Sequence, residues 1–370
     1  MKKTIALFVA AASLAFASPA SAQTAYSDVP TGHWADAPVR YVAEVNDWLR
    51  VPGRSFYPNR AVTRGLFARA LVKAFAPNEH PSDAIQLSDV LPTSSFYVPA
   101  NVAVKRGWLT KSGTKFNPSG TVSKAVMDRA LARALGLSAE IRGISAIATE
   151  DGYRFKHPSQ LAYGVIASQL GFHFNYPNAM RRELQPSTPV SRADVAKALR
   201  AATTAGRSWR LNNLQRYREI TLPRMSAVRK RMVEYALRYA EHPYIYAGQS
   251  SAGFDCSGFV WWVLRAGMGN AAARGYNGWS IPQRASYDMA RATSRKIDPT
   301  RLLPGDLLFW ATDGGPTDQW RSVGHAGIYL GNGWFIHSSG SRAGVSIDRM
   351  TDGYWNETFV WGRRVIPTKA

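Results

Sequence analysis

Residues 253–263 read GFDCSGFVWWV, and this stretch decides the fold of the C-terminal part of the chain. A polar, glycine-containing loop ends at Asp255, and an apolar run typical of a helix follows Ser257. Cys256 is therefore expected at a helix N-terminus, where positive potential favours the thiolate over the thiol. Cys256 is the single cysteine of the 370-residue chain, so an internal disulfide is excluded. This placement predicts a nucleophilic cysteine.

Histidine is the expected acceptor of the thiol proton. Two of the seven histidines, His325 and His337, lie in strand-like runs, VGHAGIYL and WFIH, on either side of a GNG turn at 331–333. A three-residue or bulged turn puts both side chains on one face, whereas a two-residue turn without a bulge separates them. We predict the first arrangement, with His325 as the base and His337 orienting it. The alternative for His337 is a hydrogen-bonded histidine beside a core strand.

Zinc binding is the competing use of one cysteine and two histidines. The sequence has no H-E-x-x-H motif and no paired cysteines. We therefore expect neither a metal site nor a cofactor.

Four motifs in order resemble the NlpC-type cell-wall cysteine peptidase family: FDCSGFV at 254–260, LPGDL at 303–307, GHAGIYLGNG at 324–333 and IH at 336–337. The resemblance implies an α+β, papain-like domain at 227–370, with helices packed on a small antiparallel sheet. It implies cleavage of an amide bond in peptidoglycan peptide stems, between D-Glu and the diamino acid, through a thioester.

The same resemblance assigns roles residue by residue. Cys256, His325 and His337 match the nucleophile, the base and the orienting residue, while Tyr244, Asp255 and Ser257 are assigned to substrate or oxyanion contacts. The sequence departs from the family at Ala247, where Gly is frequent, in a shifted Leu-Pro-Arg segment at 281–284, and in longer stretches at 267–280 and 311–322. The alternatives are an amidase or acyltransferase on the same fold, or a wall-binding protein with an inactive peptidase domain.

The N-terminal half contains a threefold repeat. Its copies read FYPNRAVTR at 56–64, FNPSGTVSK at 116–124 and LQPSTPVSR at 184–192, and an apolar helical pattern follows each. Thr63, Ser123 and Ser191 are expected as helix N-caps because their hydroxyls can accept a bond from an unpaired backbone N–H. Further helices are expected at 35–49, 98–108 and 160–170, ahead of each copy.

With YSDVP at 26–30 and LSDV at 87–90, these copies resemble S-layer homology repeats, at 23–78, 84–138 and 146–202. The resemblance implies a mainly α-helical three-repeat module that binds an anionic cell-wall polymer. It assigns polymer contact to four residues: Trp34, Arg64, Lys124 and Arg192. The alternative is that the three basic residues are merely solvated at helix starts.

Residues 1–22 have the pattern of a secretory signal: a positive start, an apolar run and a small-x-small site, ASA, at 20–22. An N-terminal membrane anchor is the alternative. With the net charge of +21, this predicts a secreted protein of the cell wall, periplasm or cell surface that is drawn to anionic polymer, with no nucleic-acid partner and no stable membrane insertion. Residues 203–226 are expected as a basic linker, with either a solubilising or a polymer-binding face.

Overall fold

The computed structural model describes residues 26–81, 83–173, 184–204, 212–267, 283–291, 296–312 and 314–368. The expected signal segment, residues 1–22, lies outside these ranges, as does most of the stretch at 267–280. Within the described ranges, the helices are all too short or too polar to cross a membrane.

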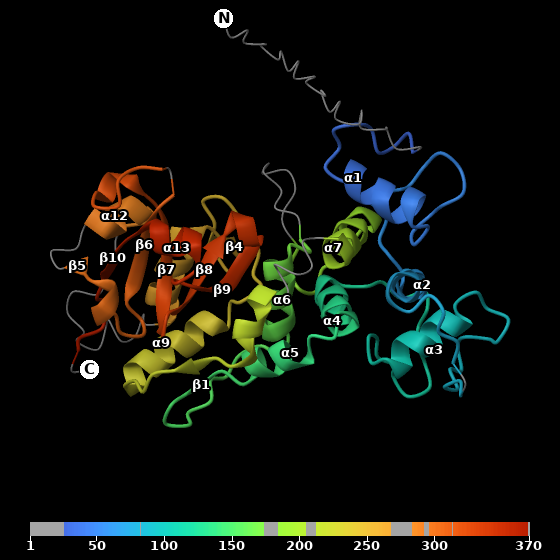
Figure 1. The fold of residues 1–370 in the computed structure, drawn as a ribbon, viewed down its shortest axis with the longest axis horizontal. Helices are drawn as coiled ribbons and strands as arrows, with labels where there is room; N and C mark the ends of the chain where they lie inside the picture. Colours follow the sequence, from blue (N-terminus) through green and yellow to red (C-terminus); the bar gives the residue numbers. More distant parts are fainter. Residues whose placement is uncertain are drawn as a thin grey trace, which may run out of the picture.

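The N-terminal part is mainly helical and forms one end of an elongated molecule (Figure 1). Its helical elements are α1 (Asp36–Val39), the π-helical turn η1 (Arg40–Val45), α2 (Arg64–Phe75), α3 (Tyr97–Lys105), α4 (Lys124–Ala134), α5 (Ser138–Ser145), α6 (Leu161–Leu170) and α7 (Arg192–Thr204). The three predicted N-caps are present: the hydroxyls of Thr63, Ser123 and Ser191 accept the N–H three residues later, at 3.4, 3.4 and 3.2 Å. Helix α5 was not anticipated from the sequence.

The three repeat copies close on one another through backbone hydrogen bonds. Val62 N–H donates to Val190 O at 3.0 Å, Val190 N–H to Val122 O at 2.9 Å, and Val122 N–H to Val62 O at 2.9 Å. All three valines are fully buried, and each directly precedes a helix N-cap. Helices α2, α4 and α7 therefore start from a common centre with approximate threefold symmetry.

The segment expected as a linker is packed wherever it is described. It forms the 3-10 turn η2 (Gln215–Arg218) and β2 (Thr221–Leu222), which pairs in parallel with β1 (Ala148–Thr149). Tyr217 and Leu222 are fully buried. Their apolar side chains, which a solvated spacer would lack, fix this segment against the third repeat.

The C-terminal part is built on a six-stranded sheet in the order β5-β10-β6-β7-β8-β9, antiparallel throughout. Its strands are β5 (Lys296–Ile297), β6 (Leu307–Ala311), β7 (Val323–Gly331), β8 (Trp334–Ser339), β9 (Gly344–Arg349) and β10 (Phe359–Arg363), with a separate hairpin of β3 (Gln249–Ser250) and β4 (Gly253–Phe254). Its helical elements are α9 (Ala227–Leu237), α10 (Cys256–Trp262), η3 (Val263–Gly267), α12 (Ser286–Arg291), η4 (Pro299–Arg301), η5 (Trp320–Ser322), η6 (Gly340–Arg342) and α13 (Gly353–Glu357).

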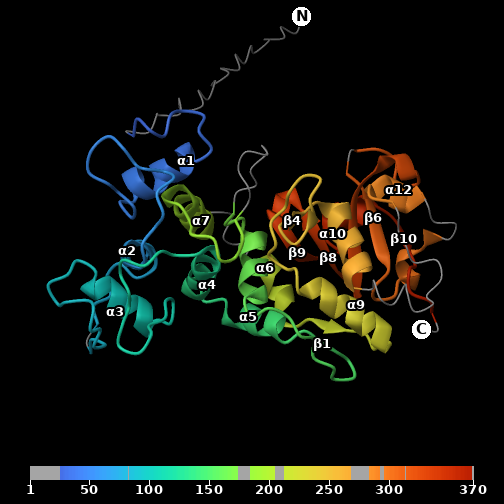
Figure 2. The ribbon, with the colours of Figure 1, turned by 180° about the vertical axis from the view of Figure 1, so that it is seen from behind.

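Successive side chains along each strand point to opposite faces of the sheet, and both faces are buried. Phe309 and Ile328 belong to the larger core, which includes Phe259 of α10. Trp310 and Phe335 point the other way, into a smaller cluster closed by Trp355 of α13. Figure 1 shows α13 over one face and Figure 2 shows α10 over the opposite face.

Helix α6 covers the edge strand β9 and so joins the two parts of the molecule. Both views place it between the helices of the repeats and the sheet (Figures 1 and 2). The free edge of β9 is satisfied there, because the carbonyl of Ile347 accepts from Gln169 Nε2 at 3.0 Å and from the Tyr217 hydroxyl at 2.7 Å. An edge strand covered in this way cannot pair with another chain.

Candidate active site

Cys256 is the first residue of α10, as the sequence predicts. Asp255 is the N-cap, and its Oδ1 accepts the Gly258 N–H at 2.6 Å. Arg284 fixes this start from outside the helix: Nη1 and Nη2 donate to the two Asp255 oxygens at 2.9 and 2.8 Å, and Nη1 also donates to Ser257 Oγ at 2.8 Å.

The side chains of Asp255 and Ser257 are therefore occupied with Arg284 and the helix start, which differs from the expected contact with substrate. The clamp by Arg284 was missed from the sequence, although its segment at 281–284 had been noted as a shifted family motif.

The Cys256 sulfur lies against β7 on both sides of His325. Sγ is 3.7 Å from Gly324 O, and it accepts a hydrogen bond from the backbone N–H of Ala326. In the described part of the chain the thiol makes no hydrogen bond to the His325 ring. Proton transfer therefore needs the thiol to turn from the Gly324 carbonyl towards the imidazole, a tightening that commonly comes with substrate.

The surroundings of Cys256 favour its thiol, which opposes the thiolate expected at a helix N-terminus. Burial, and then the neighbouring Asp255 carboxylate, raise the pKa of Cys256 to about 11. The Ala326 and Ser257 N–H groups and Arg284 act in the opposite direction but do not outweigh burial. With burial as the dominant influence on the sulfur, a base is needed to take the proton during the reaction.

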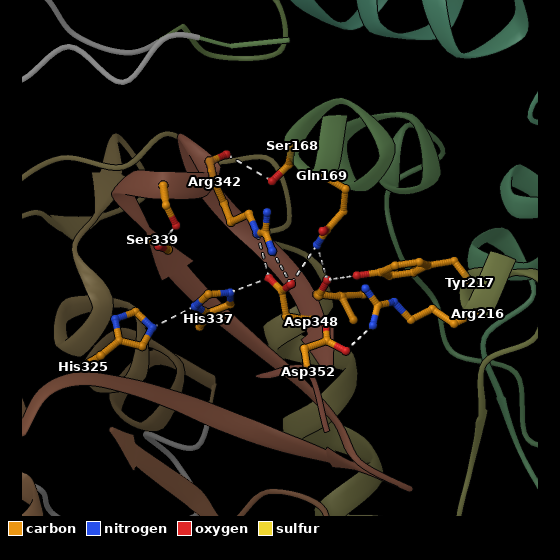
Figure 3. Close-up of polar contacts among 12 residues, drawn as sticks. Ser168, Gln169, Arg216, Tyr217, His325, His337, Ser339, Arg342, Asp348 and Asp352 are labelled. Atoms are coloured by element: carbon orange, nitrogen blue, oxygen red, sulfur yellow. Dashed lines mark hydrogen bonds and ion pairs between the residues drawn. The ribbon is translucent and has the colours of Figure 1, made fainter. Parts of the chain in front are cut away.

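His325 and His337 meet as the sequence predicts. His325 Nε2 and His337 Nδ1 are 2.7 Å apart, and His337 Nε2 is 2.9 Å from Asp348 Oδ2 (Figure 3). Both rings pack against Trp355, at centroid distances of 5.2 and 4.9 Å.

The Asp348 carboxylate determines which atom donates in each hydrogen bond of the series Asp348–His337–His325. Because Asp348 is ionised and can only accept, His337 must carry its proton on Nε2 and accept at Nδ1. His325 must then donate from Nε2, which leaves a lone pair on its Nδ1. That lone pair is what a general base beside Cys256 requires.

Electrostatics keep the pair of imidazoles neutral. Burial lowers the pKa of His325 well below its usual value, and burial likewise lowers the pKa of His337 against the opposing pull of Asp348. The pKa of Asp348 is below its usual range because the Arg342 guanidinium and His337 outweigh the cost of its own burial. The site thus holds a neutral base ready to accept a proton.

Asp348 and its partners were missed from the sequence. Arg342 donates to Asp348 twice, from Nη2 to Oδ1 at 2.6 Å and from Nε to Oδ2 at 3.0 Å. Gln169 of α6 donates from Nε2 to Oδ1 at 2.9 Å (Figure 3). A carboxylate eleven residues after His337, on the neighbouring strand, was the available signal, whereas nothing local marks Gln169.

The turn between β7 and β8 explains how both histidines share a face. Asn332 and Gly333 form a two-residue turn with positive φ, 49° and 81°, and the register shifts between Tyr329 and Gly331. Because of this bulge, the side chains of His325 and His337 point to the same face of the sheet, which a plain two-residue turn would have prevented. The predicted bulged hairpin is confirmed.

Tyr244 lies in the segment that leads to the β3–β4 hairpin, and it forms a parallel bridge with Phe254, two residues before Cys256. The chain then passes through Ala247 at φ 59°, the left-handed region that favours glycine. The backbone of Tyr244 is therefore held near the segment that carries the nucleophile, and the role of its side chain stays a prediction.

Two of the predicted polymer contacts are inside the N-terminal module. Arg192 is 5% exposed and donates to Phe56 O at 2.7 Å and Leu49 O at 2.8 Å. Burial lowers the pKa of Arg192 to about 10. Lys124 is 4% exposed and lies 3.5 Å from Asp128. Both cations stabilise the module and are not displayed to a polymer, so these two assignments are corrected.

Arg64 and Trp34 are half-buried. Arg64 donates to Phe116 O at 2.8 Å and to Thr110 O, and its guanidinium lies 4.8 Å from the centre of the Phe116 ring. A cavity of about 660 Å³ opens beside it. Its lining is Arg64, Asp89, Thr110, Lys111, Ser112, Lys115, Phe116 and Asn117.

A larger cavity, of about 830 Å³, opens where α6 and α7 meet the C-terminal part, and Gln169, Arg342 and Trp355 are among its lining residues. Among the residues that the structure describes, no group of three or more His, Cys, Asp or Glu side chains is arranged to hold a metal ion.

Comparison with known proteins places a family match on the same part of the chain. Residues 241–364 match the model of the NlpC/P60 family. The "Probable endopeptidase NlpC" of Escherichia coli K12 is 34% identical over 123 residues, which are 33% of this chain and 69% of that protein. The "Probable peptidoglycan endopeptidase LytE" of Bacillus subtilis is 33% identical over 125 residues, 33% of this chain and 30% of that protein.

A third relative, the "Gamma-D-glutamyl-L-lysine dipeptidyl-peptidase" of Bacillus cereus, is 32% identical over 125 residues, 34% of this chain and 33% of that protein. A crystal structure of an NlpC/P60 family protein from Bacillus cereus has 32% identity, covers 34% of this chain and 36% of that chain, and has a TM-score of 0.28. The chain thus spans about a third of the length of its Bacillus relatives. The predicted NlpC-type peptidase domain is confirmed over residues 241–364, and the S-layer homology interpretation stays a prediction.

Proposed function

The chain belongs to the NlpC/P60 family, and from that premise we propose that it is a peptidoglycan hydrolase acting through Cys256. It cleaves an amide bond of the peptide stem, between D-Glu and the diamino acid. The observation that carries the proposal is the series of hydrogen bonds from Asp348 through His337 to His325, together with the contact of the only cysteine's sulfur with the backbone of Gly324, the residue next to His325.

The reaction follows from the tautomers. His325 Nδ1 takes the Cys256 proton as the sulfur attacks the stem carbonyl, and the oxyanion that forms faces the backbone N–H groups at the start of α10, with Tyr244 nearby. His325 returns the proton to the leaving amine, which leaves a thioester. Water then attacks the thioester with His325 again as the base, and the acid product and free thiol are released.

The choice of bond rests on relatives. One is named a γ-D-glutamyl-L-lysine dipeptidyl-peptidase and another, from Bacillus licheniformis, a peptidoglycan DL-endopeptidase. An amidase or acyltransferase on the same fold would use the same three residues. Only the reaction products therefore distinguish these activities from the proposed endopeptidase.

Digestion of purified wall followed by mass analysis of the fragments tests this directly. We expect fragments with a new D-Glu terminus from wild type and none from Cys256→Ser. Alkylation with iodoacetamide is a matched control, because Cys256 is the only thiol and the fold needs no substitution. Fragments from the Cys256→Ser protein would refute the nucleophile, and free muramic acid ends would indicate an amidase.

We further propose that the protein is secreted and that residues 26–202 anchor it to an anionic wall polymer. The support is the +21 charge and the cavity beside Arg64, which also carries Lys111 and Lys115. Trp34 stays a candidate contact on the first repeat.

Co-sedimentation of full-length Cys256→Ser with wall sacculi tests the anchoring. Replacing Arg64, Lys111 and Lys115 by Ala should weaken binding at low salt, and added salt should weaken it in the parent as well. Replacing the exposed Arg50, Arg54 and Lys105 by Ala removes the same charge elsewhere and is the control. Equal losses of wall binding in both triple variants would show that the cavity beside Arg64 contributes only non-specific charge attraction.

A further inference from the structure

Gln169 connects the N-terminal module to the catalytic histidines. It lies in the last turn of α6, and its single amide nitrogen makes two hydrogen bonds to β9, one to Asp348 Oδ1 at 2.9 Å and one to Ile347 O at 3.0 Å. The two partners are 178 and 179 residues away in sequence. Figure 3 shows this side chain reaching from α6 to the carboxylate that holds His337.

The Asp348 carboxylate is saturated by this arrangement. Oδ1 accepts from Gln169 and from Arg342 Nη2, while Oδ2 accepts from His337 and from Arg342 Nε. Two donors on each oxygen fix the plane of the group as well as its position. Asp348 is fully buried, so loss of a donor leaves one of its oxygens short of a hydrogen bond from the protein.

Helix α6 also positions Arg342. The hydroxyl of Ser168, next to Gln169, donates to the carbonyl of Arg342 at 3.0 Å. Two consecutive residues of α6 therefore hold both the carboxylate and the turn that carries its main cationic partner.

We propose that α6 of the third repeat is part of the catalytic unit, with Gln169 acting as a positioning residue that orients Asp348 and, through His337, the base His325. The N-terminal module is then required for chemistry as well as for location. This inference rests on the proposed roles of His325 and Cys256.

A purely structural role is the competing explanation, because α6 also covers the edge of β9. The positioning role and the purely structural role predict different effects of a change in charge at position 169. A carboxylate at position 169 would lie beside Asp348 and favour protonation of the imidazole pair, whereas loss of edge cover alone would lower stability and leave the titration of the base unchanged.

The experiment uses the full chain with Gln169→Leu and Gln169→Glu. Gln160→Glu, at the start of the same helix, makes the same change in charge away from Asp348 and is the matched control. The first readout is the pH dependence of Cys256 alkylation by iodoacetamide, which reports the base without requiring hydrolysis. The second is kcat and KM on a soluble stem peptide.

For Gln169→Leu we expect kcat to fall about 10-fold with little change in KM, a typical loss for a supporting residue behind a site. For Gln169→Glu we expect the same fall, with the acid limb of the alkylation profile about one pH unit higher. Gln160→Glu should match wild type in both readouts.

Wild-type kcat and wild-type alkylation profiles in both Gln169 variants, with only a lower melting temperature, would overturn the inference. If wild type cleaves no peptidoglycan but Gln169→Glu still shifts the alkylation profile, the proposed function fails while the positioning role stands.

Discussion

Two arginines, one in each half of the chain, serve different purposes. In the N-terminal module, Arg192 forms no ion pair with a described carboxylate; it donates to two carbonyls of the first repeat and holds the ring of repeats closed. In the peptidase part, Arg342 pairs with Asp348, and Asp348 accepts a hydrogen bond from His337. This contact determines which nitrogen of His337 carries the proton. Arg192 is thus a structural element, whereas Arg342, whose side chain is 24% exposed, belongs to the catalytic hydrogen-bond series, and sequence context alone does not distinguish the two roles.

The largest effect is expected for Asp348→Asn. Either orientation of the amide would direct an NH₂ group at a donor, because both Asp348 oxygens accept from Arg342. If the NH₂ faces His337, the two tautomers reverse and His325 Nδ1 carries a proton that blocks it as a base. We expect kcat/KM to fall about 10³- to 10⁴-fold, by analogy with the same change behind other catalytic histidines.

Nitrogen NMR of the imidazoles checks that prediction independently, since His337 should change from the Nε2–H to the Nδ1–H form. Asp352→Asn is a control that lies nearby and pairs with Arg216 instead. Full activity in Asp348→Asn would show that the carboxylate is only structural, as Arg192 is.

A second prediction addresses the module. Arg192→Met should leave two buried carbonyls without a donor and lower the free energy of unfolding by about 2–4 kcal/mol. Thermal unfolding measures the loss, and Arg60→Met, an exposed change in the first repeat, is the control. A variant with unchanged stability but lost wall binding would instead restore Arg192 as a polymer contact.

The sequence predicted the local chemistry well. Helix N-caps, the cysteine at the start of α10 and the bulged hairpin all follow from residue type and spacing within about ten residues. Arg342 was missed although it lies only six residues before Asp348. Gln169 and Arg284 were missed because their partners, 179 and 29 residues away, are brought to them only by folding. The same limit explains the incorrect assignment of Lys124 and Arg192 to polymer contact. The local sequence around a basic residue at a helix start does not show whether that residue faces solvent or a neighbouring repeat.

A third prediction concerns pH and the contact between the halves. Glu241 is 6% exposed, has no ion-pair partner among the described residues, and lies so close to α6 that a Cβ on Gly164 would be 1.9 Å from its Cγ. Burial raises the pKa of Glu241 from 4.5 to about 8. Since the folded state holds the proton that the unfolded state releases, stability should fall as pH rises from about 4.5 to 8 and level off above.

Glu241→Gln removes that proton and should flatten the fall. We expect its melting temperature to exceed that of wild type by several degrees at pH 8 and to differ little at pH 5. Glu219→Gln, an exposed change, should leave the wild-type slope intact. A parallel pH slope in Glu241→Gln and wild type would mean that this carboxylate is ionised in the fold, and that the halves tolerate an unpaired buried charge.

The smallest effect tests whether strain near the nucleophile is functional. Ala247 is exposed and has φ 59°, a conformation that costs an alanine about 1 kcal/mol and a glycine almost nothing. Ala247→Gly should therefore raise the free energy of unfolding by up to about 1 kcal/mol, whereas Ala252→Gly, exposed in the same region without a positive φ, should lower it slightly. If Ala247→Gly gains stability but loses kcat, the alanine restrains the loop that carries Tyr244, and rigidity rather than charge is what this side of the site contributes.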